Sequence, residues 1–255
     1  MNCFVETLGH GPDVVLLHGW GLHGGVFARI AEQLADRYTL HLVDLPGHGA
    51  SPLPTGPYTA EAIADSLAEQ FPLPLQLVGW SLGGLIAQHW AHRSPGTVKS
   101  LTLVATSPLF VRDDGWDHAQ PRAQIEAVGA NLDTSFELTL ERFLALQTLG
   151  APAARDTLKA LRELLFAHGS PQGLSPALQL LLDADARAIA PEIGSPTALL
   201  FGARDMITPI GAGRWLAETL PDATLTEFPQ ASHAPFLSHE TDFVAALRRH
   251  LDQHA

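Results

Sequence analysis

The sequence has little that could form covalent crosslinks or cross a membrane. Cys3 is the single cysteine among 255 residues, which excludes an internal disulfide and a cysteine-based zinc or iron–sulfur centre. No segment approaches the roughly 20 consecutive apolar residues that span a bilayer. Residues 1–6 carry no basic stretch followed by an apolar one, so they do not resemble a secretory signal. We therefore expect a soluble intracellular protein.

Positive charge is scarce as well. The chain has 15 Lys and Arg residues against 27 Asp and Glu residues, which gives a formal charge of −12 with neutral histidine. This balance argues against general nucleic-acid binding, which depends on neutralising phosphates, and against attachment to anionic membranes through a basic cluster. Hydrophobic residues make up 46% of the chain, enough to bury a large core in one α/β domain, with or without an insertion.

Short apolar runs alternate with helical patterns along most of the chain. The runs predict strands buried on both faces of a parallel sheet, at residues 14–17, 40–44, 75–80, 98–105, 197–201 and 223–228. Apolar residues at helical spacing predict helices between them, at residues 26–37, 59–71, 82–93, 213–220 and 240–251. This alternation is typical of a doubly wound, mostly parallel α/β sheet.

The stretch 108–191 breaks this alternation. It has helical patterns at 134–149 and 153–166 but no convincing strand, and an expected strand lies on either side of it. We therefore expect residues 1–107 and 192–255 to form one α/β core, into which this stretch is inserted as a helical cap. A cap in this position would cover the C-terminal edge of the sheet, where open α/β sheets bind ligands.

The strongest functional signal is a nucleophile motif at residues 79–84, which read Gly-Trp-Ser-Leu-Gly-Gly. This G-x-S-x-G sequence directly follows an expected strand and directly precedes an expected helix, the context that the motif requires. A tight turn there holds Ser81 in a strained backbone conformation with its hydroxyl outward, while the glycines let strand and helix approach closely. The alternative is a serine in an ordinary glycine-flanked turn, and the residues downstream argue against it.

A serine hydroxyl becomes a nucleophile only with a base and a group that orients that base. In this fold class the partners follow the serine in the order acid, then histidine. Asp205 ends an expected strand and His233 follows the last one, so both would lie beside Ser81 at the C-terminal edge of the sheet. Singly, Asp205 could be a turn or helix-capping acid, and His233 an exposed loop histidine. Their order and positions together predict a catalytic triad of Ser81, Asp205 and His233.

Acyl transfer also needs N–H donors that face the oxygen on which negative charge develops. The residue after the nucleophile supplies one donor, which is Leu82 here. The loop after an early strand supplies the other, and residues 18–21 of that loop read His-Gly-Trp-Gly. The main chain of Trp20 is therefore the second expected donor. Its indole is expected to wall the acyl pocket, or to serve packing alone.

A metal site is not expected beside this machinery. His89 and His92 lie three residues apart on the expected helix after Ser81. A zinc ion needs at least a third protein ligand, and the pattern around these two histidines offers none.

With these motifs in place, nearly the whole chain resembles the α/β-hydrolase superfamily. Five segments make it resemble more closely the carboxylesterases of biotin synthesis, which cleave the methyl ester of pimeloyl-acyl carrier protein: residues 18–22, 40–47, 79–85, 141–148 and 231–236. The fourth segment discriminates best, because caps differ widely between hydrolase families. The resemblance implies a monomeric cytoplasmic enzyme with no cofactor. It also implies a substrate site lined by Trp20, Ser81, Leu82, Phe143, Leu144, Ala145, Leu146, Gln147 and His233.

Part of the expected cap is basic although the chain is acidic. Between residues 142 and 162 there are four cations, Arg142, Arg155, Lys159 and Arg162, and one acid, Asp156. The last three cations recur at i, i+4 and i+7 and therefore share one face of a helix. One interpretation is an ordinary solvated helix surface. The other is a docking site for a strongly acidic acyl carrier protein, which such charges would steer.

Three alternative functions share these features. A general short-chain carboxylesterase and a carbon–carbon bond hydrolase would use the same triad, so only the cap separates them from the expected function. A non-catalytic ligand receptor on the same fold is the third alternative, and the intact triad and oxyanion loop weigh against it. We therefore expect a serine carboxylesterase that acts on the methyl ester of pimeloyl-acyl carrier protein and on small esters.

Overall fold

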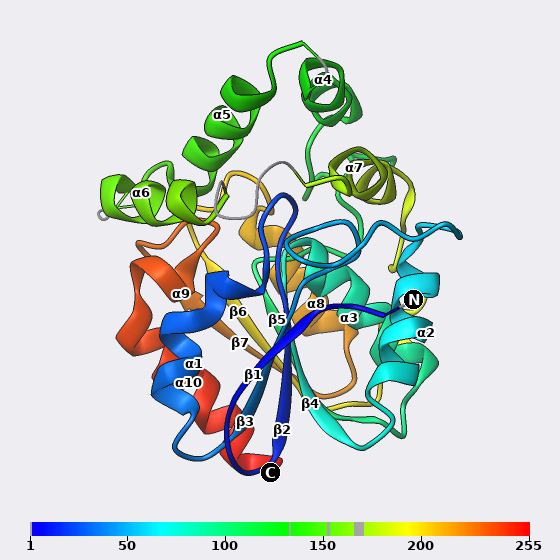
Figure 1. Ribbon diagram of the computed structural model, residues 1–255, viewed down its shortest axis with the longest axis vertical. Helices are drawn as coiled ribbons and strands as arrows, with labels where there is room; N and C mark the ends of the chain where they lie inside the picture. The colour runs from blue at the N-terminus through cyan, green and yellow to red at the C-terminus, as the bar shows by residue number, and fades with distance from the viewer. Residues whose placement is uncertain (1, 133, 152–153, 166–170) are drawn as a thin grey trace.

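A seven-stranded sheet forms the centre of the computed structural model, which describes residues 2–132, 134–151, 154–165 and 171–255 (Figure 1). The strand order is β1-β3-β2-β4-β5-β6-β7. β1 runs antiparallel to β3, and all other neighbouring pairs are parallel. The strands are β1 (Val5–Gly9), β2 (Asp13–Leu17), β3 (Thr39–Val43), β4 (Leu75–Trp80), β5 (Val98–Val104), β6 (Thr197–Gly202) and β7 (Ala223–Phe228). The predicted mostly parallel α/β sheet is confirmed.

The strands follow the apolar runs of the sequence, with one exception. Every residue of β4 and of β6 is buried, which is why their runs are apolar apart from Gln76 and Thr197. The runs do not predict β1, because this edge strand is exposed or half-buried along its whole length.

Helices cover both faces of the sheet (Figure 1). On one face α1 (Ala28–Leu34) packs against α10 (Glu240–Gln253), and on the other α2 (Ala60–Gln70) packs against α3 (Leu82–Arg93). α8 (Ile210–Thr219) packs on β6 and β7. Three short helices complete the core: η1 (Gly24–Phe27), η2 (Ala190–Glu192) and α9 (Pro235–Ser238).

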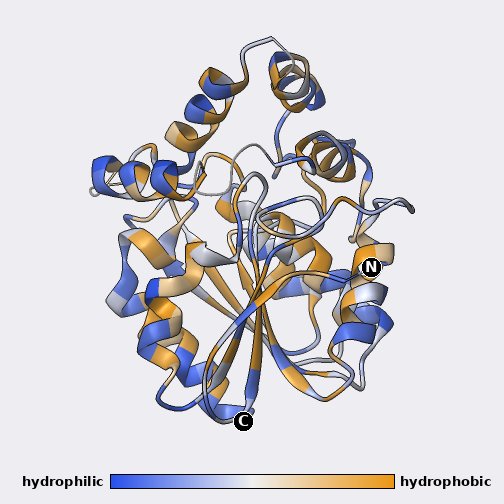
Figure 2. Cartoon of the chain, in the orientation of Figure 1, coloured by the Kyte–Doolittle hydropathy of each residue, from blue (hydrophilic) through white to orange (hydrophobic). Residues whose placement is uncertain are grey.

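Local signals explain where these helices begin and which side they bury. The Thr59 hydroxyl accepts a hydrogen bond from the Ala62 N–H at 3.2 Å, which caps the start of α2. Ile63 and Leu67 then lie one turn apart on its buried face. Figure 2 shows the general pattern: hydrophobic residues follow the strands, and hydrophilic residues lie mostly on the outer sides of the helices.

Between β5 and β6, four helices form a separate layer at one end of the sheet (Figure 1). They are α4 (Arg122–Leu132), α5 (Phe136–Thr148), α6 (Ala154–Leu165) and α7 (Leu174–Asp183). The helical patterns of the sequence predict α5 and α6, although Ala153 and Phe166 of the second prediction lie outside the described residues. We call these four helices the helical layer.

α4 and α7 were not predicted from periodicity. In α4 only Leu132 is buried, so its apolar residues do not form a continuous stripe. In α7 the opposite holds, because six of its ten residues are buried and the helix is apolar nearly all round. Among the described residues, no helix is both long enough and apolar enough to cross a bilayer.

Candidate active site

Ser81 occupies the turn between β4 and α3. Its backbone has φ 54° and ψ −118°, a region that side-chain-bearing residues rarely adopt. The Ser81 N–H donates to the Val104 carbonyl at 3.0 Å, and the Ser81 carbonyl accepts from the Thr106 hydroxyl at 2.6 Å. The neighbouring strand therefore holds the serine in this strained conformation, as expected where strain serves a site.

Two glycines of the motif are required by close packing. A Cβ on Gly79 would lie 2.5 Å from the Gly83 carbonyl oxygen. A Cβ on Gly83 would lie 2.2 Å from the Leu17 carbonyl oxygen, on β2. Since real Cβ atoms do not approach backbone oxygens so closely, only glycine lets the first turn of α3 rest on the strands. This packing presents Ser81 at the C-terminal edge of the sheet.

The structure brings the three residues of the predicted triad together. The Ser81 hydroxyl lies 3.0 Å from His233 Nε2, and His233 Nδ1 lies 2.7 Å from Asp205 Oδ2. These residues follow β4, β7 and β6 and so converge from three strands of one sheet edge. The side chains of His233 and Asp205 are 1% and 0% exposed. One neutral tautomer fits both contacts: Nδ1–H donates to the carboxylate, and Nε2 accepts from the serine hydroxyl.

The Asp205 carboxylate has further donors besides the histidine. Oδ1 accepts from the Ile207 N–H at 2.8 Å and the Thr208 N–H at 3.0 Å, and Oδ2 accepts from the Thr208 hydroxyl at 2.7 Å. That hydroxyl is also 3.3 Å from His233 Nδ1. Thr208 therefore belongs to the site, although the sequence gives it only as a polar residue before Pro209.

The His233 main chain is fixed from both sides. Its N–H donates to the Gln147 carbonyl of α5 at 3.1 Å, and its carbonyl accepts from Trp80 Nε1 at 2.8 Å. Gln147 thus contacts the predicted base through its backbone. Its side chain is 1% exposed, and Oε1 finds no hydrogen-bond partner among the described residues. Sequence motifs could not have indicated a contact made by backbone atoms.

The two predicted oxyanion donors lie next to Ser81. A Cβ on Gly19 would lie 3.2 Å from the Ser81 Cβ, so the Gly19–Trp20 peptide passes directly beside the nucleophile. Within the described part of the chain, neither the Trp20 N–H nor the Leu82 N–H donates a hydrogen bond. The Trp20 indole donates to the Leu174 carbonyl at 2.9 Å and packs edge-on against Phe143, with ring centroids 4.9 Å apart.

A cavity of about 330 Å³ opens above Ser81. Of the residues that the family resemblance implies, Trp20, Ser81, Phe143 and Leu146 line it. Nine further residues that the sequence motifs do not predict also line it: Phe110, Gln120, Gln124, Ile125, Val128, Leu178, Leu181, Met206 and Ile207. The pairs at 125 and 128 and at 178 and 181 show the i, i+3 apolar spacing of a helix face, which was the signal available for them.

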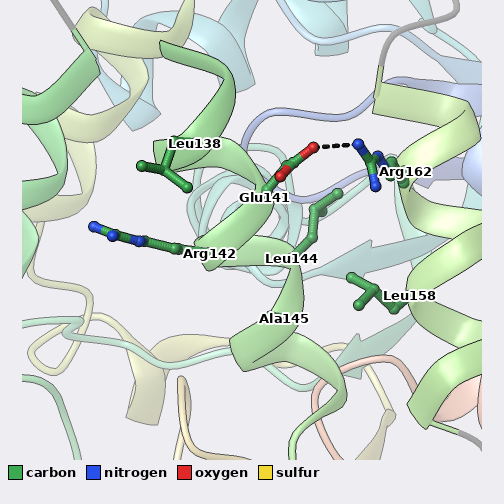
Figure 3. A pocket seen from close by; sticks show the side chains of 7 residues that line it. All are labelled: Leu138, Glu141, Arg142, Leu144, Ala145, Leu158 and Arg162. Carbon is green, nitrogen blue, oxygen red and sulfur yellow. Dashed lines mark ion pairs between the residues drawn. The ribbon is translucent and has the colours of Figure 1, made fainter. Parts of the chain in front are cut away.

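Leu144 and Ala145 face a different space. They line a second cavity of about 300 Å³ on the outer side of α5, together with Leu138, Leu158 and Arg162 (Figure 3). The helix separates the two cavities because its residues fall on two faces: Phe143 and Leu146, three residues apart, face the first cavity. Leu138, Arg142 and Ala145, spaced at i, i+4 and i+7, face the second. Leu82, Gln147 and His233 do not line the first cavity. Leu82 follows Ser81 in the chain, His233 is hydrogen-bonded to Ser81, and Gln147 is hydrogen-bonded to His233.

The four cations of the basic stretch lie at the surface of α5 and α6. Arg162 forms an ion pair with Glu141, and Lys159 lies 4.0 Å from Glu163 (Figure 3 shows the first pair). Arg142 and Arg155 have no ion-pair partner among the described residues. No cluster of His, Cys, Asp and Glu residues in the described ranges could hold a metal ion.

Comparisons with known proteins agree with this geometry. The profile of the alpha/beta hydrolase family matches residues 14–247, so the chain belongs to this family. The chain is 74% identical over its full length to a protein of Chromobacterium violaceum named pimeloyl-acyl-carrier-protein methyl ester esterase, which it also covers completely. It is 42% identical to a protein of the same name from Stenotrophomonas maltophilia, covering 96% of this chain and 94% of that protein. The resemblance noted in the sequence is confirmed, and with it the expected enzyme class, an ester hydrolase.

Solved structures support the fold independently. An esterase from Exiguobacterium antarcticum superposes with a TM-score of 0.90 at 24% identity, covering 98% of this chain and 95% of that one. A thermophilic esterase from Thermogutta terrifontis gives a TM-score of 0.86 at 23% identity, covering 99% and 94%. At this level of identity the likeness concerns the fold alone.

Proposed function

We propose that the protein is a serine esterase that hydrolyses the methyl ester of pimeloyl-acyl carrier protein and so serves biotin synthesis. The observation that carries this proposal is the buried chain of hydrogen bonds from Ser81 through His233 to Asp205, which opens into an apolar cavity. The substrate is inferred from the two relatives, which are both named pimeloyl-acyl-carrier-protein methyl ester esterase. Residues 108–191 act as the cap of an α/β core formed by residues 1–107 and 192–255.

The reaction begins at the ester carbonyl. The Ser81 oxygen attacks the carbonyl carbon while His233 Nε2 takes the hydroxyl proton, and Asp205 stabilises the imidazolium that forms. The carbonyl oxygen becomes negative and accepts hydrogen bonds from the Trp20 and Leu82 N–H groups, which have no other acceptor in the described chain. The carbon–oxygen bond to the methoxy group then breaks, and His233 protonates the leaving methanol.

Water completes the cycle. His233 Nε2 removes a proton from a water molecule, whose oxygen attacks the acyl carbon of the serine ester. The same two N–H groups bind the second oxyanion. The bond from the acyl carbon to Ser81 breaks, the serine recovers its proton from His233, and the pimeloyl carboxylate leaves. No step needs a cofactor.

The cavity and the cap surface suit the two parts of this substrate. The cavity is lined mainly by apolar side chains, six of them from α4, α5 and α7, which favour a methylene chain. Arg142 and Arg155 are exposed cations on α5 and α6 without an ion-pair partner among the described residues, and their charge is opposite to that of an acidic carrier. Lys159 and Arg162 lie on the same surface, beside Glu163 and Glu141. We propose this surface as the docking site of the carrier and the protein as a cytoplasmic monomer.

A general short-chain carboxylesterase is the second candidate. Gln120 and Gln124 are the only polar side chains besides Ser81 among the residues that line the cavity, if the indole N–H of Trp20 is set aside. Apolar contact discriminates weakly between acyl chains, by a factor of about 10 to 200 per methylene. The cavity would therefore accept small free esters as well, and selection for the carrier-bound ester would depend on the docking site.

Turnover of the carrier-bound methyl ester beside matched free methyl esters tests the proposal. Wild-type protein should hydrolyse the carrier-bound ester with the higher kcat/KM, and Ser81→Ala should reduce ester turnover by about 10⁴-fold or more. Ser94→Ala, at the far end of α3, is the matched control and should keep full activity. Substantial turnover by Ser81→Ala would refute the mechanism. Equal kcat/KM for both substrates would favour the general esterase.

A further inference from the structure

His18 is a buried histidine next to the site that the mechanism above does not use. It follows β2 and is 0% exposed. Its Nδ1 lies 2.8 Å from the Gly19 carbonyl oxygen, and its Nε2 lies 2.9 Å from the Leu45 nitrogen. A carbonyl oxygen only accepts and a backbone N–H only donates. These two contacts therefore require one tautomer, with the proton on Nδ1 and a lone pair on Nε2.

The first of these bonds acts on a peptide group of the oxyanion hole. The carbonyl of Gly19 and the N–H of Trp20 belong to the same planar trans peptide, so they point in opposite directions. A bond that fixes the carbonyl therefore fixes the direction of the N–H. A Cβ on Gly19 would lie 3.2 Å from the Ser81 Cβ, which places this peptide against the nucleophile.

The same bond also affects the strength of the donor. A hydrogen bond to the carbonyl polarises the amide, and polarised amides are better donors at their N–H. The only other group bonded to the Gly19 carbonyl in the described residues is the Leu22 N–H, at a longer 3.4 Å. His18 is therefore the shorter and better-placed of the two donors.

Its surroundings keep His18 neutral. Burial holds the pKa of His18 well below its usual value, and His48, whose ring centroid is 5.4 Å away, lowers it further. A protonated ring would carry a second N–H directed at the Leu45 N–H, which is repulsive. The neutral Nδ1–H form is thus the one compatible with both contacts.

We propose that His18 is a positioning residue for the oxyanion hole: its Nδ1–H orients the Gly19–Trp20 peptide so that the Trp20 N–H faces the developing negative charge. The proposal rests on the proposed ester hydrolysis at Ser81. The two can fail separately, because turnover by Ser81→Ala would refute the hydrolytic mechanism, whereas the variants below change only His18.

Two substitutions divide the functions of the ring. In His18→Asn the amide nitrogen takes the place of Nδ1 and can still donate to the Gly19 carbonyl, but the acceptor for the Leu45 N–H is lost. In His18→Gln the amide oxygen reaches the place of Nε2 and can still accept from Leu45, but the donor to Gly19 is lost. A positioning role predicts that kcat falls roughly 10- to 100-fold in the Gln variant, less than the loss of a whole oxyanion donor. KM should stay near the wild-type value, and the Asn variant should recover most of kcat.

The readouts separate positioning from a merely structural role. A boronic acid that bonds to Ser81 places an anionic oxygen in the oxyanion hole, so its affinity should fall in parallel with kcat across the variants. The changes in Tm should not follow the changes in kcat. His48→Asn, which alters the neighbouring ring but not the Gly19 bond, is the packing control and should keep kcat. Equal losses of kcat in the Asn and Gln variants, or a Gln variant within about twofold of wild type, would overturn the proposal.

A measurement on the wild-type protein does not depend on the folding of any variant. With ¹⁵N-labelled histidine, the ring of His18, assigned through its proximity to the Leu45 amide proton, should show a protonated Nδ1 and an unprotonated Nε2 near neutral pH. The opposite tautomer at that pH would overturn the proposal, because its Nδ1 could not donate to Gly19.

Discussion

The edge of the sheet and the helical layer above it hold the two halves of the site in different ways. At the sheet edge, the hydroxyl, imidazole and carboxylate are buried and joined by bonds of 2.7 to 3.0 Å. In the helical layer, the cavity residues touch through apolar surface, and Leu146 is 47% exposed. Lys159 and Arg162 there form solvent-exposed ion pairs, whereas Arg142 and Arg155 are exposed cations without such a partner in the described ranges.

This difference separates chemistry from selection. Groups that must be aligned for proton transfer follow three strands of one rigid sheet, β4, β6 and β7, where a small displacement would be costly. Groups that choose the substrate come from helices joined by loops, where apolar contacts tolerate change. We therefore expect changes at the sheet edge to lower kcat and changes in the helical layer to raise KM.

The largest expected effect tests the sheet edge directly. Asp205→Asn keeps the shape of the side chain but cannot stabilise the imidazolium, and its amide favours the wrong tautomer of His233, so kcat should fall about 10⁴-fold. The control is Asp222→Asn, an exposed acid in the loop before β7. Steady-state kinetics on a free methyl ester measures both. A loss below about 100-fold would mean that Asp205 does not orient the base.

The second prediction concerns acid stability near the sheet edge. Burial lowers the pKa of His48 from 6.5 to about 4, so between these pH values the unfolded chain binds more protons than the folded one. The unfolding free energy should therefore fall as the pH drops from 6.5 to 4, by about 3 kcal/mol for this group.

Urea unfolding at pH 7 and pH 4 measures that loss. His48→Asn can keep the donor to the Pro46 carbonyl, which His48 Nδ1 contacts at 3.1 Å, but it cannot titrate. Its unfolding free energy should depend less on pH than that of the wild type. An unchanged pH dependence in the variant would show that other groups control acid unfolding.

The third prediction tests the charged surface of the helical layer. The pair of charge reversals Arg155→Glu and Lys159→Glu should raise KM for the carrier-bound ester about tenfold, because like charges would then face the acidic carrier. The control pair, Lys99→Glu and Arg249→Glu, changes the net charge equally but lies on β5 and α10, outside the helical layer. Both pairs should leave KM for a short free ester unchanged. Equal effects on KM for both esters would refute the proposal that this surface docks the carrier.

The smallest effect is expected for the apolar cavity. Ile125→Ala removes methylene groups from a half-buried side chain that lines it, so KM for a pimeloyl-length free ester should rise about three- to tenfold with kcat unchanged. Leu138→Ala, on the outer side of α5, is the control and should change neither constant for a free ester. A fall in kcat for Ile125→Ala would contradict the expectation that changes in the helical layer affect KM and not kcat.

The sequence predicts the sheet better than the helical layer for a physical reason. A strand that is buried on both faces consists mostly of apolar residues, and the turn at Ser81 needs glycines at fixed positions, so both leave local patterns. Tertiary packing decides which residues of α4 and α7 face the cavity. In the sequence, the only sign of these two helices is a pair of apolar residues at i, i+3 in each. The contact of the Gln147 carbonyl with the His233 N–H joins backbone atoms that are far apart in the sequence, so it carries no sequence pattern. Thr208 lies only three residues after Asp205, but it belongs to none of the motifs that predict the triad.

The bond between the His233 N–H and the Gln147 carbonyl ties the base to the helical layer. On its other side the same residue is held by the indole of Trp80, in the core. An outward motion of α5 would stretch one of these attachments while the other stayed in place. Widening the cavity and keeping the imidazole aligned are thus competing demands on the main chain of one residue, so admitting a bulky ester and cleaving it would have to alternate in time.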